Sequence, residues 1–159
     1  MQILYGLFAL GNKVLRSHLV RTYEMEEGCW GELEYLIRIP SNWEPSNTNY
    51  PPIVFLHGLG IGMLQYQSTI TDLLQRFSNS PILIVRQPSI SQDIFHKRHL
   101  QPMDKDEMVE SLHGLLLTLG WTTHGVTVVS HSKRVLLTTR FSRELTVGLT
   151  AVALFLTHG

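Results

Sequence analysis

Short apolar stretches along the chain predict strands. Residues 33–39 alternate between apolar and polar side chains, which indicates a strand with one buried face. The runs 53–56 (IVFL) and 82–85 (ILIV) are apolar throughout, and residues 125–130 (GVTVVS) are expected to form a third buried strand. Continuous apolar strands are typical of a parallel sheet that is covered on both faces. We therefore expect a mostly parallel sheet with flanking helices.

The segments between these strands carry apolar residues at helical spacing. The two expected helices have their apolar faces at Tyr66, Ile70, Leu73, Leu74 and Phe77, and at Met108, Leu112, Leu115, Leu116 and Leu119. Asp104 and Glu107 resemble a capping box that opens the second helix, and Gly120 suits the left-handed residue after its end. The order strand–helix–strand–helix–strand predicts an α/β fold.

Both ends of the chain lie outside this pattern. The N-terminal apolar run continues through Val14, Leu15 and Leu19, so we expect an amphipathic helix, because a secretory signal usually starts with basic residues. The C-terminal tail begins with basic side chains and ends in an apolar run. A membrane span needs about 20 apolar residues, so we expect both runs to lie on a membrane surface at most. The chain is thus divided into three segments, 1–32, 33–132 and 133–159.

The composition excludes several classes of protein. Hydrophobic residues make up 43% of the 159 residues and charged residues 16%, which is typical of one globular domain. The formal net charge is +0, so we expect no nucleic-acid partner. Cys29 is the single cysteine, which excludes an intrachain disulfide.

The sequence predicts no metal or cofactor site. His96 and His99 stand three positions apart, but Pro102 argues against a helix that would place them on one face, and no third ligand is near. The glycines of GLGIG lack the spacing of a dinucleotide-binding loop, and no acidic residue ends the strand 82–85. We therefore expect loop histidines and a site that works without a cofactor.

Two of the expected strands are followed directly by motifs that are candidates for a catalytic or binding site. HGLG follows the strand 53–56, and SHS begins with the last residue of the strand 125–130. In an α/β sheet, ligands bind beyond the carboxyl ends of the strands. The stretches LHGLGIGMLQY, ISQDIFHKRHLQPM and VVSHS resemble the α/β-hydrolase family, and its fungal members in particular. The resemblance covers residues 33–132 and implies an α/β-hydrolase-type sheet.

The resemblance also implies a serine hydrolase site. Ser132 matches the nucleophile on a tight strand-to-helix turn. The backbone N–H groups of Leu59 and Lys133 match the donors that hold the oxyanion. His57 and Gly58 are expected to shape the loop, with His57 bonded to the backbone. The implied chemistry is hydrolysis of a small-molecule ester or lipid-like substrate, or of an amide, through an acyl-enzyme.

The sequence departs from the family pattern after Ser132. The residue two positions on should be small so that helix and strand can approach, but the chain has Arg134 there. The acid and the histidine of a triad would have to be Glu144 and His158. The strands that normally carry them need a dozen or more residues per connection. We therefore expect a chain truncated just after the nucleophile turn, through a splice or frame error, and not catalytically competent alone.

Alternatives to an incomplete hydrolase stay open. The chain could be a noncatalytic ligand-binding or membrane-surface module that reuses the fold. Without later strands the edge at 125–130 would be uncovered, which favours self-association or membrane contact unless residues 147–156 cover it as a strand or a helix. The pattern does not decide between a cytoplasmic and a membrane-associated location.

Overall fold

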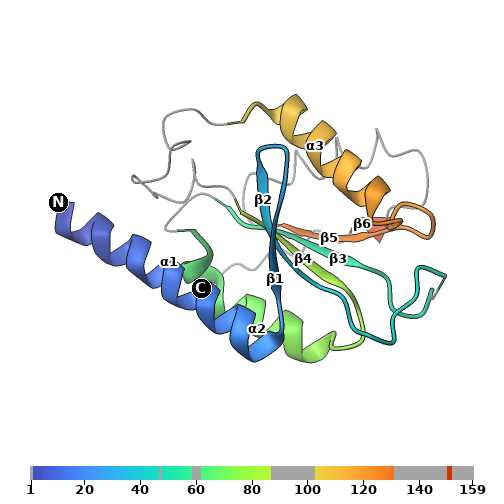
Figure 1. Ribbon diagram of the computed structural model, residues 1–159, viewed down its shortest axis with the longest axis horizontal. Coiled ribbons are helices and arrows are strands. Elements are labelled where there is room, and N and C mark those ends of the chain that lie inside the picture. The colour runs from blue at the N-terminus through green and yellow to red at the C-terminus, as the bar shows by residue number, and fades with distance from the viewer. Residues whose placement is uncertain (1, 47, 59–61, 87–102, 131–149, 152–159) are drawn as a thin grey trace.

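The protein is described here by a computed structural model (Figure 1). It describes residues 2–46, 48–58, 62–86, 103–130 and 150–151. The elements in chain order are α1 (Gln2–Tyr23), β1 (Glu26–Trp30), β2 (Leu33–Arg38), β3 (Ile53–Leu56), the 3-10 helix η1 (Gly62–Tyr66), α2 (Gln67–Arg76), β4 (Ile82–Arg86), α3 (Lys105–Thr118), β5 (Thr127–Ser130) and β6 (Thr150–Ala151).

The strands form one sheet in the order β1-β2-β4-β3-β5-β6. The pairs β4–β3, β3–β5 and β5–β6 are parallel, whereas β1–β2 and β2–β4 are antiparallel. The expected α/β architecture with a mostly parallel sheet is therefore confirmed. The antiparallel pairs are confined to one edge, where β2 enters the sheet beside β4.

Helices cover the sheet on both faces, and two apolar cores result (Figure 1). The helix α3 lies on one face, and α1 and α2 lie on the other. Within β3 the side chains of Val54 and Leu56 join the α3 core, while those of Ile53 and Phe55 join the α1–α2 core. Burial on both faces explains why this strand has no polar residue.

The ends of α3 match the expected signals. At its start the Asp104 backbone N–H donates to the Glu107 carboxylate over 3.4 Å. At its end Gly120 has a φ of +70°, its N–H donates to Leu117 at 3.0 Å, and the Trp121 N–H donates to Leu116 at 3.0 Å. These two hydrogen bonds, 6→1 and 5→2, form a Schellman motif. The left-handed glycine turns the backbone so that the N–H groups after the helix reach its last carbonyls.

The N-terminal amphipathic helix is present as α1, although its apolar residues divide between two faces. Leu15 and Leu19 are buried in the core on the α1–α2 face of the sheet. Val14, which belongs to the same apolar pattern in the sequence, is 61% exposed. Among the described residues, no helix is both long and apolar enough to cross a membrane.

The hairpin β1–β2 was not predicted from the sequence. Trp30 pairs with Leu33, so Gly31 and Glu32 form a two-residue turn, and Gly31 has a φ of +59°. The residues of β1 are mostly exposed and lack the apolar alternation that marks a strand. Pairing with β2 across a tight turn, rather than burial, therefore defines β1.

The last described strand, β6, covers part of β5. Thr150 pairs with Thr127 and Ala151 with Val128, in parallel. A strand from the region 147–156 was one of the two expected covers for this edge. The division of the chain at 32/33 and 132/133 stays a prediction.

Candidate functional site at the carboxyl ends of β3 and β5

The two motif-bearing strands are parallel neighbours, and they end at the same level of the sheet. In the register of β3 and β5, Leu56 pairs with Ser130. The two strands therefore end at the same edge of the sheet, with His57 directly after β3. In an α/β sheet this edge is where ligands bind.

His57 is a buried part of this edge. Its side chain is 0% exposed, and its Nδ1 lies 3.0 Å from the Gly58 carbonyl oxygen. Because a carbonyl only accepts hydrogen bonds, Nδ1 carries the proton in this contact. The expected bond from His57 to the backbone is thus present, and it fixes the ring against the loop that follows β3.

A tyrosine from η1 bonds to the same loop. The Gly58 backbone N–H donates to the Tyr66 hydroxyl oxygen at 3.2 Å. The Tyr66 ring is buried, packs edge-on to Phe55 at 5.8 Å between centroids, and lies 6.3 Å from the His57 ring. Tyr66 thereby connects the core under β3 to the backbone at the site.

Sequence reasoning placed Tyr66 only on the apolar face of a helix and missed this contact. A usable signal was available, because a buried tyrosine usually needs a hydrogen-bond partner for its hydroxyl group. The identity of that partner depends on how η1 packs against β3, which no local pattern encodes.

The end of β5 provides a small residue where the proposed turn requires one. Ser130 is 2% exposed and lies two positions before Ser132. Leu59, Ser132, Lys133 and Arg134 lie outside the described residues. So do the remaining candidates from the sequence, Glu144, His158, His96 and His99.

An ion pair that sequence reasoning missed lies beside the site. Arg86 ends β4, the other neighbour of β3, and its guanidinium lies 2.7 Å from the Glu34 carboxylate of β2. Both side chains are about one-fifth exposed, at 19% and 22%. The carboxylate compensates the cation, so this pair joins two antiparallel strands at the edge where β4 ends. Among the described residues, no group of histidine, cysteine or acidic side chains could hold a metal ion.

Comparison with solved structures identifies the type of fold. No protein-family model and no curated protein matches the chain. VinJ matches with a TM-score of 0.53 at 19% identity over 79% of this chain, and a proline iminopeptidase of Mycobacterium smegmatis with 0.51 at 15% over 79%. An esterase of Rhizomucor miehei gives 0.47 at 17% over 80%.

The fold is of the α/β-hydrolase type. At these identities the likeness concerns the fold alone. The chain spans 40%, 41% and 43% of the three matched structures. The resemblance to fungal hydrolases and the truncation after the nucleophile turn stay predictions.

Proteins with the α/β-hydrolase fold carry their active sites at the carboxyl ends of the parallel strands. In this fold the nucleophile projects from a strand-to-helix turn, and one oxyanion donor comes from a loop that follows another strand. The loop at His57 and Gly58 follows β3, and the chain from residue 131 onwards follows β5. The parallel register aligns the last residues of the two strands, Leu56 and Ser130.

Proposed function

We propose that this chain provides the nucleophile and the oxyanion loop of a serine hydrolase site. In this proposal the Ser132 hydroxyl is the nucleophile, and the backbone N–H groups of Leu59 and Lys133 hold the oxyanion. The supporting observation is the register of the parallel strands β3 and β5, which aligns Leu56 with Ser130. Because of this register, we expect the segment with Leu59 and the segment with Ser132 and Lys133 to begin at the same edge of the sheet.

The proposed chemistry is hydrolysis of an ester. The Ser132 oxygen attacks the ester carbonyl carbon, and its proton passes to a general base. The base returns the proton to the departing alcohol, which leaves an acyl-enzyme. Water then attacks the acyl carbon and releases the acid, restoring the serine. The substrate class we propose is a small-molecule or lipid-like ester.

The base and the acid are the parts we propose to be lacking in the chain by itself. His57 is fully buried and bonded to the Gly58 carbonyl oxygen, which suits a structural role in the loop. After Ser132 the only acid and histidine are Glu144 and His158, at spacings too short for intervening strands and crossover helices. A serine without a base and an orienting acid is a weak nucleophile.

Arg134 adds a second reason to expect weak activity. The residue two positions after the nucleophile packs where helix and strand approach closely, and an arginine there disfavours the strained turn. A relaxed turn misdirects the backbone N–H of Lys133, and the loss of one oxyanion donor costs about 10²–10³ in rate.

A fluorophosphonate probe tests whether Ser132 is activated in the folded chain 1–159. We expect no labelling of Ser132 beyond the background of the Ser132→Ala variant, because no base removes the hydroxyl proton. Circular dichroism would establish that both proteins are folded. Labelling that disappears in Ser132→Ala would contradict the proposed lack of competence.

The position of Ser132 is tested separately by thiol accessibility. In a Cys29→Ser background, Ser132→Cys should react with a soluble thiol reagent at least about tenfold faster than the matched variant Ser130→Cys. The reason is that the nucleophile turn projects its side chain outward, whereas Ser130 is 2% exposed. Equal protection of the two thiols would rule out Ser132 as the exposed residue of the turn.

A further inference from the structure

The outward face of α1 is apolar. Leu7, Leu10 and Val14 are 58%, 57% and 61% exposed, and they follow one another at intervals of three and four positions. Such spacing places them on one face of a helix. Leu15 and Leu19 occupy a different face, which is buried in the core. The helix α1 therefore has two apolar faces, and packing against the sheet accounts for only one.

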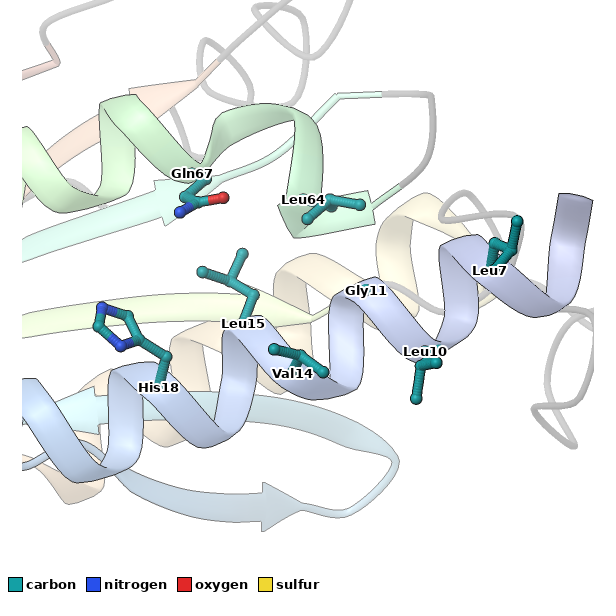
Figure 2. Close-up of a pocket in the computed structure, with 8 residues that line it drawn as sticks. All are labelled: Leu7, Leu10, Gly11, Val14, Leu15, His18, Leu64 and Gln67. Carbon is teal, nitrogen blue, oxygen red and sulfur yellow. The ribbon is translucent and has the colours of Figure 1, made fainter.

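A groove extends this apolar face toward η1 (Figure 2). It is open, has a volume of about 460 Å³, and lies between α1 and the start of α2. Leu64 of η1 lies on the side opposite α1. Gly11 permits the close approach, because a Cβ there would lie 2.7 Å from a methyl carbon of Leu64. The exposed leucines thus form the outer rim of a larger apolar surface.

The charges of α1 are all positive. The helix contains Lys13, Arg16 and Arg21 and no aspartate or glutamate. Arg16 pairs with Glu27 of β1 at 3.2 Å, while Lys13 and Arg21 are exposed. On a helical wheel Arg21 lies on the same face as Leu7, Leu10 and Val14, two turns after Val14, and Lys13 lies beside that face. Glu24, Glu26 and Glu27 follow the helix in the sequence.

Positive charge beside exposed leucines favours an anionic membrane over a second copy of the chain as the partner of this face. A second copy of the same face would bring Lys13 and Arg21 close to like charges, which disfavours self-association. An anionic bilayer offers negative headgroups for the cations and acyl chains for the leucines.

We propose that α1 docks the protein on an anionic membrane surface. The helix lies parallel to the bilayer, with Leu7, Leu10 and Val14 at the acyl boundary and Lys13 and Arg21 at the headgroups. The groove beside Leu64 faces the same boundary. This docking does not depend on Ser132, so it can hold or fail independently of the proposed hydrolase site.

Vesicle sedimentation of the chain 1–159 tests the proposal. The protein should sediment with vesicles of phosphatidylcholine containing phosphatidylserine, and far less with phosphatidylcholine alone. The double variant Leu7→Ser/Leu10→Ser and the double variant Lys13→Gln/Arg21→Gln should each lower the partition coefficient about tenfold, through lost insertion and lost charge respectively. High salt should weaken binding of the unchanged protein.

The matched control is Leu117→Ser. Leu117 is 54% exposed on α3, whose first turn carries Asp106 and Glu107, so its loss should leave vesicle binding unchanged. Circular dichroism should show all variants folded, because the substituted side chains are exposed. Failure of the folded protein to bind anionic vesicles would overturn the proposal. So would equal binding to neutral vesicles, an equal effect of Leu117→Ser, or self-association that Leu7→Ser/Leu10→Ser abolishes without vesicle binding.

Discussion

At the scale of single residues, the hydroxyl group of Tyr66 is the contact that holds the loop after β3. It accepts the Gly58 N–H, which is buried and leaves the sheet at the candidate site. A buried backbone N–H that loses its partner costs free energy because water cannot replace the bond. The orientation of the loop thus depends on a side chain eight positions further along the chain.

The substitution Tyr66→Phe should lower the free energy of unfolding by about 1–2 kcal/mol, because the ring packing stays and only the acceptor of the Gly58 N–H is lost. Urea unfolding followed by circular dichroism measures the change. Tyr50→Phe is the control, since Tyr50 is 42% exposed and its loss of a hydroxyl group should have little effect. Equal changes in the two variants would argue against a specific role for Tyr66.

At the scale of elements, Arg38 joins the end of β2 to the end of α2. Its guanidinium donates to the carbonyl oxygens of Leu74 and Phe77, both at 3.0 Å. A cation at this position satisfies carbonyls that have no partner within the helix and complements the helix dipole. Burial lowers the pKa of the Arg38 guanidinium, and Tyr23 partly opposes this shift.

The substitution Arg38→Met should lower the free energy of unfolding by about 1–3 kcal/mol, because it keeps the aliphatic stem but removes both charge-assisted hydrogen bonds. Amide hydrogen exchange should rise most at the end of α2, where both carbonyls lose the guanidinium, although the Phe77 carbonyl keeps the Ser80 N–H at 3.1 Å. The control is Arg76→Met, since Arg76 also lies in the last turn of α2 but is exposed. An equal loss of stability in both variants would show that the charge near the helix end matters rather than the two bonds.

At the scale of the whole molecule, the sheet separates two apolar cores. Leu19 is fully buried in the α1–α2 core, and Leu112 is fully buried in the α3 core. All three tryptophans belong to the α3 side: Trp121 and Trp43 pack in its core, and the indole of Trp30 lies against Gly114 of α3. Tryptophan fluorescence therefore reports on one face only.

The substitution Leu19→Ala should lower the free energy of unfolding by about 2–5 kcal/mol, because it leaves a cavity in a closed core. If the sheet couples its two faces, fluorescence and circular dichroism should show the same lowered urea midpoint, although Leu19 lies on the face without tryptophan. Leu117→Ala, at an exposed position, should change little. A fluorescence midpoint that stays unchanged while the circular dichroism midpoint falls would mean that the two cores unfold separately.

The features that could be predicted from the sequence are those encoded by local patterns of residues. The strand at 53–56 and the helix that ends before Gly120 were predicted from periodicity, buried runs and end signals, and the structure confirms them. Each of these signals lies within a few residues of the feature that it predicts. The strand β1 was missed because its residues are exposed and carry no apolar alternation.

The candidate site was predictable only in part, for the same reason. The motif HGLG pointed to His57 and Gly58, and the buried run before SHS pointed to the end of β5. That the two lie on neighbouring parallel strands, in a register that pairs Leu56 with Ser130, is a tertiary fact. The bond from Gly58 to Tyr66 and the ion pair of Arg86 with Glu34 are also tertiary.

The sequence by itself determined the strands β2, β3, β4 and β5, the helices between them, their order, and the α/β class, because local periodicity and end signals act over a few residues. The tertiary structure alone decided that β2 joins the sheet beside β4 and that α1 buries Leu15 while leaving Val14 to solvent. Strand neighbours and helix orientation depend on the total apolar area that is buried between segments distant in the chain. A short stretch of sequence does not encode this area.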